Sequence, residues 1–308
     1  MAASDYQVLD PRFRRLVNAS AHVQKLWTGC QWAEGPAYFP AHRSLVWSDI
    51  PANRLMRFDE AGLGVSVFRQ PSGHANGNTI DHQGRLVTCE HGGRRVSRTE
   101  HDGAIVTLAD RFEGKRLNSP NDVVVRSDGS IWFTDPTYGI DSDYEGDKAD
   151  SEIGASNVYR VDPATAAITI VGRDFIQPNG LAFSPDERHL YIVDTGRSHG
   201  DQHPAHMRVF DVGDGGTLRG GRVFADCSAG FFDGLRLDEA GRIWTSAADG
   251  VHCYDPDGTL IGKVLVPETV ANLCFGGPKR NHLYICGTTS LYAVFLLVNG
   301  ARLISASA

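Results

Sequence analysis

The chain alternates apolar and polar residues in short segments, and the same arrangement returns at regular intervals along its 308 residues. Each copy continues through a short apolar strand, turns, and enters a second strand rich in Ile, Leu, Val, Trp and Tyr, and all but one of the copies begin with a polar residue. Six copies occur, at residues 34–49, 76–90, 121–135, 179–194, 233–247 and 271–286. They recur about every 47 residues, and helical periodicity is nearly absent.

A repeat of this length, built from antiparallel strands, is typical of one blade of a β-propeller. The sequence therefore predicts an all-β fold, a six-bladed β-propeller with four-stranded antiparallel blades. No linker interrupts the series, so we expect residues 1–308 to form a single domain, with residues 1–25 as a leading extension. We expect the segment HVQKLWTGCQW to pair with the C-terminal strands, because closing the ring removes exposed sheet edges.

The overall charge narrows the choice of partner. The formal net charge of -7 and the lack of a basic run argue against nucleic acid or an anionic membrane. The first residues lack the apolar core of a signal peptide, and the late apolar run LYAVFLLV is too short to span a bilayer. We therefore expect a cytoplasmic protein with a small-molecule partner, as a monomer or a homodimer.

Six cysteines without CxxC spacing favour buried thiols.

The polar residues that begin the copies are expected to meet. The first strand of each propeller blade lies innermost, so the residues that head successive first strands converge on the axis at one face. These heads are Glu34, Asn76, Asn121, Asn179, Asp233 and Ala271. A single Asn or Asp can simply be a turn residue before a strand. Polar heads at five of the six positions favour a common site.

The chemistry of these heads predicts a cation. Glu34 and Asp233 would place two carboxylates at the mouth of the channel, where they repel each other unless a cation neutralises them. The amide oxygens of the asparagines add hard, neutral ligands. This all-oxygen set favours one divalent cation, Ca²⁺ first, with Mg²⁺ or Mn²⁺ as alternatives and Zn²⁺ less suited to a site without His or Cys.

Four motifs, WAEGPAY, NSPNDVVV, PNGLAFSPD and DGLRLDEAGRIW, together resemble the gluconolactonase and regucalcin (senescence marker protein) family of six-bladed propellers. The segments TCEHGGRR and WFTDPTYG look more like bacterial gluconolactonases than animal regucalcin. The resemblance implies that Glu34, Asn121, Asn179 and Asp233 are the metal ligands and that Asp233 is the general base. Regucalcin-like sequences carry an arginine where this chain has Ser119, so their sugar contacts are not carried over.

The expected reaction is the hydrolysis of a sugar lactone to its aldonic acid, with the metal polarising the lactone carbonyl while water attacks. This mechanism needs no nucleophile elbow. Activation of the water by Asp233 and activation by the cation both stay open, because a cation lowers the proton affinity of an aspartate that binds it. A phosphotriesterase on the same scaffold and a non-catalytic binding propeller are the alternatives. The sequence does not name the lactone.

The loops after the second strands are expected to surround the metal face. From these loops and from the segments entering the first strands, we expect Asn76, Asn118 and His206 to contact the substrate. Residues 139–156 form a loop long enough to be a lid, although its acidic run is equally typical of a solvated surface loop. For His199, His203 and His206, substrate contact or an exposed position is favoured over a second metal site.

Overall fold

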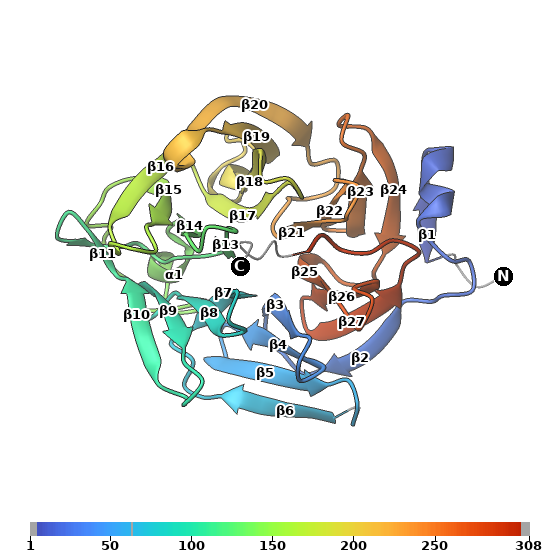
Figure 1. The fold of residues 1–308 in the computed structure, drawn as a ribbon, viewed down its shortest axis with the longest axis horizontal. Helices are drawn as coiled ribbons and strands as arrows, with labels where there is room; N and C mark the ends of the chain where they lie inside the picture. The colour runs from blue at the N-terminus through green and yellow to red at the C-terminus, as the bar shows by residue number, and fades with distance from the viewer. Residues whose placement is uncertain (1–4, 63, 303–308) are drawn as a thin grey trace.

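Six small antiparallel sheets stand in a ring around one axis, each with one edge strand beside that axis (Figure 1). The computed structural model describes residues 5–62 and 64–302. Each sheet of the ring has four strands, and one of them gains a fifth. The predicted six-bladed β-propeller with four-stranded antiparallel blades is confirmed.

The blades follow one another in chain order, and the strands of each blade succeed one another from the axis outward. Blade 1 contains β3 (Ala33–Phe39), β4 (Ser44–Asp49), β5 (Arg54–Asp59) and β6 (Gly64–Arg69). Blade 2 contains β7 (Ala75–Ile80), β8 (Leu86–Glu90), β9 (Arg95–Thr99) and β10 (Ile105–Ala109). Blade 3 contains β13 (Val123–Val125), β14 (Ile131–Asp135), β15 (Ser156–Val161) and β16 (Ile168–Phe175).

The second half of the ring repeats this order. Blade 4 contains β17 (Pro178–Phe183), β18 (His189–Asp194), β19 (His206–Val212) and β20 (Leu218–Asp226). Blade 5 contains β21 (Leu235–Leu237), β22 (Ile243–Ala247), β23 (Gly250–Tyr254) and β24 (Leu260–Leu265). Blade 6 contains β25 (Val270–Gly276), β26 (His282–Gly287), β27 (Ser290–Phe295) and β2 (Gln24–Thr28).

Short elements lie between and within the blades. The strands β11 (Arg111–Phe112) and β12 (Lys115–Arg116) form a hairpin between blades 2 and 3. The helical turns are η1 (Pro11–Arg15), α1 (Tyr138–Asp141), η2 (Gly196–His199) and η3 (Asp214–Gly216). Within the described part of the chain, none of the helices has the length and apolar character needed to cross a membrane.

An N-terminal strand closes the ring. β2 runs antiparallel to β27, with Gln24 opposite Ala293 and Thr28 opposite Ser290. The predicted pairing of this segment with the C-terminal strands is therefore confirmed. Before it, β1 (Tyr6–Val8) pairs with β24 and adds the fifth strand to blade 5. Most of the expected leading extension is thus built into the edge of that blade, while residues 1–4 lie outside the described residues.

Large apolar side chains from the strands form the core between the blades. Three fully buried tryptophans lie on the second strands of their blades: Trp47 on β4, Trp132 on β14 and Trp244 on β22. All six cysteines are free, and all except the partly buried Cys227 are buried. The sequence-based prediction of buried thiols is therefore confirmed for the other five.

Hydrogen bonds join the innermost strands of neighbouring blades close to their polar heads. Three of these bonds follow one pattern, in which the N–H of the residue after one head donates to the carbonyl of the next blade's head. They join Gly77 to Asn121 at 2.8 Å, Gly180 to Asp233 at 3.1 Å and Gly234 to Ala271 at 2.8 Å. These bonds hold the heads in one ring around the axis.

The blades approach each other so closely at these positions that a side chain does not fit. A Cβ atom on Gly77 would lie against the carbonyl of Asn121 and 2.6 Å from the Cα of Asp122. Glycines of three other blades are confined by their neighbours in the same way: Gly35, Gly180 and Gly234. The glycine that follows each of these four heads therefore sets how near the heads lie to one another.

We predict that Gly77→Ala destabilises the ring, whereas Gly64→Ala does not. The first substitution forces two blades apart, with an expected loss of about 1–3 kcal/mol in the free energy of unfolding, as for other overpacked sites. Gly64 is the matched control, because a Cβ there would meet no atom within 4 Å and its backbone needs no left-handed conformation. Urea unfolding of the two variants measures the difference. Equal stabilities would contradict the assigned role of the glycine.

Candidate functional site

One mouth of the central channel carries both the strand heads and the loops that follow the second strands. In blade 1, Ala33 at the start of β3 lies opposite Asp49 at the end of β4. In blade 4, Pro178 at the start of β17 lies opposite Asp194 at the end of β18. The loops after β4 and β18 therefore open beside the heads, as predicted from strand direction. We call this side the head face.

Local irregularities in the strands turn the head side chains out of the ladder. The pairing shifts between Glu34 and Ala37 in β3, between Ala75 and Asn78 in β7, and between Pro178 and Leu181 in β17. Such bulges re-aim side chains and are common beside active sites. Asn121 and Asp233 instead stand two residues ahead of the regular strands β13 and β21.

Glu34 is buried at the head of β3 with only one of its carboxylate oxygens hydrogen bonded. Its Oε2 accepts hydrogen bonds from Nδ2 of Asn272, at 2.9 Å, and from the N–H of Gly35. Its Oε1 has no hydrogen-bond partner among residues 5–62 and 64–302. Burial, and next the charges of Asp233 and Asp122, raise the pKa of Glu34 well above its ordinary value.

Asp233, which heads blade 5, lies close enough to Glu34 for its charge to act on that carboxyl, with blade 6 between their two blades. Its carboxyl group is surrounded by protein although part of the residue stays accessible. Burial, followed by the charges of Asp122 and Glu145, raises the pKa of Asp233 to about 8. A hydrogen bond from the side chain of Asn179 acts in the other direction. The structure therefore brings Glu34, Asp233 and Asn179 together at the axis.

Asn121 is fixed through its backbone and keeps its side chain free. Its N–H donates to the carbonyl of Thr134 at 2.8 Å, and its carbonyl accepts from Gly77. The side-chain amide has no hydrogen-bond partner within the described part of the chain. The residue as a whole is 4 % exposed, and its amide is an unused ligand on the ring of heads.

A second polar layer lies next to the heads on the channel side. Oδ1 of Asp122 accepts a hydrogen bond from the N–H of Val123 at 2.8 Å, and its Oδ2 lies 3.6 Å from Nη1 of Arg236. Burial raises the pKa of Asp122, and the charge of Arg236 opposes that rise. Asp122 thus has a cationic neighbour. Within the described residues, no ion pair reaches Glu34 or Asp233.

The donor set fits a hard divalent cation. Glu34 and Asp233 are carboxylates without a positive partner, and Asn121 and Asn179 add amide oxygens. Across residues 5–62 and 64–302, no three His, Cys, Asp or Glu side chains form a group that could hold a metal. A cation on the axis would therefore need the amides as well as the carboxylates, which is the ligand chemistry of Ca²⁺ and its hard relatives.

Asn76 belongs to the ring of heads and is tied to a buried histidine. Its Nδ2 lies 3.1 Å from Nε2 of His91, while its Oδ1 is buried without a hydrogen-bond partner in the described residues. Burial lowers the pKa of His91 to about 3, so this ring is neutral near pH 7. The expected contact of Asn76 with substrate stays a prediction, and its free Oδ1 is an acceptor for it.

The other two expected substrate contacts lie farther from the heads. Asn118 is fully buried, donates to the carbonyls of Asp135 at 3.1 Å and Ala155 at 2.9 Å, and accepts from Ser151 at 2.5 Å. These bonds anchor the loop before β15 and use both hydrogens of its amide. His206 starts β19, the third strand from the axis, opposite Asp194. For both residues, substrate contact stays a prediction.

The long loop between β14 and β15 packs over the head face. It begins with α1 and brings Glu145 near the axis, where the charge of Glu145 contributes to the raised pKa of Asp233. Burial, followed by the charge of Asp141, raises the pKa of Glu145 itself to about 7. The loop is exposed along much of residues 141–152, yet its start and Gly146 are buried. It is therefore partly the expected surface loop and partly a cover of the site.

Two histidines of the neighbouring loop make polar contacts with different partners. His199 Nε2 lies 2.8 Å from Oδ2 of Asp141, and His203 Nε2 lies 3.0 Å from Nε2 of Gln202. These contacts place both residues on the rim of the head face.

Four residues of the site region were missed by reading the sequence alone: Asp122, Glu145, Arg236 and Asn272. Asp122 and Asn272 directly follow heads, at the two registers where glycine is replaced by a polar residue. That substitution was a visible signal. Glu145 carried no such signal, because its position depends on how a long loop folds back.

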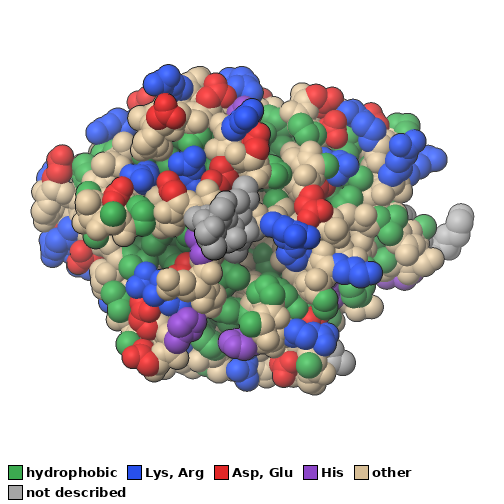
Figure 2. Space-filling model, viewed as in Figure 1, with side chains coloured by type: hydrophobic (Ala, Val, Ile, Leu, Met, Phe, Trp, Pro, Cys, Tyr) green, Lys and Arg blue, Asp and Glu red, His purple; other side chains and the backbone are tan. Residues whose placement is uncertain are grey.

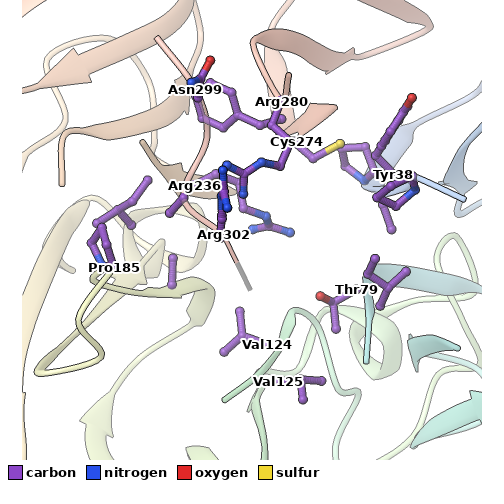
Figure 3. Close-up of a pocket in the computed structure, with 18 of the residues that line it drawn as sticks. Tyr38, Thr79, Val124, Val125, Pro185, Arg236, Cys274, Arg280, Asn299 and Arg302 are labelled. Atoms are coloured by element: carbon purple, nitrogen blue, oxygen red, sulfur yellow. The ribbon is translucent and has the colours of Figure 1, made fainter. Parts of the chain in front are cut away.

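A cavity of about 870 Å³ opens at the other mouth of the channel (Figure 3). Its walls are the later residues of the innermost strands and the turns that follow them, including Val124, Phe183 and Phe275. Basic side chains also line it: Arg43, Arg236, Lys279, Arg280 and Arg302. Figure 2 shows Lys and Arg side chains around the centre of this face. The cavity therefore lies on the far side of the polar heads.

Comparison with known proteins connects this geometry to a family. Residues 32–289 match the family described as the SMP-30/Gluconolactonase/LRE-like region. The chain is 30 % identical over 310 residues to the gluconolactonase of Zymomonas mobilis, covering 92 % of this chain and 84 % of that relative. A gluconolactonase structure from Xanthomonas campestris has a TM-score of 0.89 and 37 % identity, with 94 % of each chain covered.

A more distant structure shares the architecture. Regucalcin from Agrobacterium tumefaciens, a calcium-binding protein, has a TM-score of 0.74 at 21 % identity and covers 92 % of this chain and 97 % of its own. At this identity the similarity shows the fold.

We predict that the cation-free protein loses stability as the pH rises from 7 to 8. The folded-state pKa values of Glu34 and Asp233 lie above their unfolded values, so the folded protein binds more protons in this window and the free energy of unfolding falls as the pH rises. The slope is at most about 1.4 kcal/mol per pH unit for each carboxyl. His91 acts in the opposite direction at the lower end of this window, because its pKa is lowered to about 3 in the folded protein while the unfolded histidine still binds some protons near pH 7.

Urea unfolding in chelator at pH 7.0, 7.5 and 8.0 measures this slope. The double variant Glu34→Gln/Asp233→Asn is the control, because it lacks both of these groups and should show a smaller slope. The slope that remains comes from other carboxyls, such as Asp135 and Glu145, whose pKa values burial raises to about 7. Saturating Ca²⁺ should reduce the slope of the wild type towards that of the double variant, since a bound cation keeps both carboxylates ionised. The same slope in wild type and double variant would show that the axial carboxyls are not its cause.

Proposed function

The chain belongs to the SMP-30/gluconolactonase/LRE-like family, and from that membership we propose that it hydrolyses a sugar lactone to the aldonic acid at the ring of heads, with one divalent cation. Its gluconolactonase relatives make lactone hydrolysis the reaction class. The proposal adds the site, the cation and the role of each head residue.

One observation carries the proposal: two buried carboxylates lie at the axis without a positive partner in the described residues. Burial, followed by the charges of nearby carboxylates, raises the pKa values of Glu34 and Asp233, while Asp122 beside them has Arg236 as a counter-charge. Leaving two such groups unpaired costs stability, and a bound cation would offset that cost. Free ligands at Glu34 Oε1 and at the Asn121 amide support the same site.

The head residues would have different roles in the reaction. Glu34, Asn121, Asn179 and Asp233 would hold the cation, and Ca²⁺ suits their oxygens best, with Mg²⁺ and Mn²⁺ as close alternatives. When bound, the cation would supply positive charge to the lactone carbonyl oxygen as negative charge develops there. Asp233 would accept a proton from the attacking water and return it to the ring oxygen, which would leave as the alcohol of the open acid.

We predict that the purified protein hydrolyses D-glucono-1,5-lactone and that exhaustive chelation abolishes this activity. Ca²⁺, Mg²⁺ or Mn²⁺ should restore it, because the proposed ligands are all oxygens. Acid release at constant pH measures the rate, and elemental analysis confirms the removal of metal. Paraoxon, an organophosphate triester, serves as the comparison substrate. Full activity in verified metal-free protein, or a preference for the triester, would refute the proposal.

We predict that Asp233→Asn lowers kcat by about 10²-fold or more at full cation occupancy. The amide keeps an oxygen ligand but is no base, and a positioned base contributes about 10²–10⁴-fold. Glu34→Gln is the matched comparison, because it weakens cation binding without removing the base. Excess Ca²⁺ should therefore rescue Glu34→Gln and leave Asp233→Asn slow. A near-normal kcat for occupied Asp233→Asn would show that the water is not activated by Asp233.

A further inference from the structure

The start of the long loop is pressed against the floor of the head face. The N–H of Gly139 donates to Oγ of Ser119 at 3.0 Å. A Cβ atom on Gly139 would come within 2.7 Å of the His91 ring carbon Cγ and 2.8 Å of Cβ of Ser119. Gly146 lies against the carbonyl of Gly139 in turn. The loop therefore folds back on itself directly above His91, and Glu145 immediately precedes this contact.

The next blade fixes the same segment from the other side. Tyr138 Oη lies 2.9 Å from Oγ of Ser198. Oδ2 of Asp141 lies 2.8 Å from Nε2 of His199, whose ring packs edge-on against Tyr138 with centroids 5.3 Å apart. Two elements that are distant in sequence, α1 and η2, thus hold each other at the rim. These contacts between α1 and η2 fix the position of Glu145, which lies further along the same loop.

Glu145 presents an unused carboxylate to the site. Its side chain is 23 % exposed and has no hydrogen-bond partner in the described part of the chain. Its charge acts on Asp233 and on Tyr138, so it lies on the axial side of the loop. Other acidic residues of this loop, such as Asp147 and Asp150, are exposed to solvent.

A buried histidine stands behind that carboxylate. His91 is fully buried, and Nδ2 of Asn76 donates to its Nε2, so the proton of the neutral ring is on Nδ1. Among the described residues Nδ1 makes no hydrogen bond of normal geometry; it lies 3.7 Å from Oε2 of Glu145, and the backbone of Glu145 also interacts with the His91 ring. This separation exceeds a hydrogen bond by less than about 1 Å. A small shift of Glu145 would therefore complete a chain from Asn76 through His91 to the carboxylate.

We infer that Glu145 is a specificity residue that accepts hydrogen bonds from the hydroxyl groups of the lactone, with His91 and Asn76 as the positioning residues behind it. The inference rests on the proposed function and names the substrate class: polyhydroxylated lactones are selected over lactones that lack hydroxyls. A carboxylate only accepts hydrogen bonds, so its natural partners are hydroxyl donors. Bonds to a charged group are also stronger than bonds between neutral groups.

The test compares two six-membered lactones, D-glucono-1,5-lactone and δ-valerolactone, which lacks ring hydroxyls. Glu145→Ala should raise KM for the gluconolactone about ten-fold or more, since hydrogen bonds to charged groups have that magnitude, and should change kcat/KM for δ-valerolactone by less than about two-fold. Glu145→Gln, which keeps the size of the side chain, should show an intermediate loss. Asp150→Asn on the same loop is the matched control and should behave as the wild type.

The outcomes separate this inference from the proposed function. Equal losses on both lactones, or no loss on either, would overturn the role of Glu145 while leaving the lactonase intact. A wild-type protein that hydrolyses neither lactone with Ca²⁺, Mg²⁺ or Mn²⁺ present would overturn the lactonase and the inference with it. Melting temperatures of the variants identify a misfolded loop, and Glu145→Gln then carries the comparison.

Discussion

The close approach of the innermost strands is the constraint on which the site depends. Gly35, Gly77, Gly180 and Gly234 each follow a polar head, and at each of them a Cβ atom would overlap the neighbouring blade. Hydrogen bonds from Gly77, Gly180 and Gly234 to the next head replace the missing side chains as the contact between blades. Glutamate, aspartate and asparagine side chains that are distant in sequence are thereby brought around one axis. The same contacts that complete the fold create the crowded polar site.

Charge then distinguishes the groups within this ring. Asp122 and Asn272 occupy the two registers that lack glycine, where Asn272 donates to Glu34 and Asp122 lies beside Arg236. Glu34 and Asp233 are left without a cationic neighbour in the described residues, and their raised pKa values reflect the electrostatic cost. A cation would satisfy these two carboxylates, and the fold supplies rigid backbone positions for its ligands. The loop that carries Glu145 adds the variable part of the site on top of this fixed ring.

Reading the sequence was sufficient for those features that repeat. The six blades, the strand that closes the ring and the identity of the heads all follow from a pattern of alternating residues with a constant spacing. Features that occur only once in the chain could not be predicted from its sequence. Glu145 reaches the axis because the loop packs on His91, and nothing in the residues of the loop specifies that fold. The hydrogen bonds of the Asn118 amide to Ala155 and Ser151 join residues more than thirty positions apart, and only the folded loop reveals them.

The central claim is that Glu34, Asn121, Asn179 and Asp233 together hold one divalent cation at the axis. Crystals of the protein grown with Mn²⁺ and measured near the manganese absorption edge would test it most directly. We predict one strong anomalous peak on the axis, about 2.0–2.6 Å from oxygen atoms of all four side chains. A peak bound elsewhere, or an axis without a peak in crystals of protein that is active with Mn²⁺, would contradict the account.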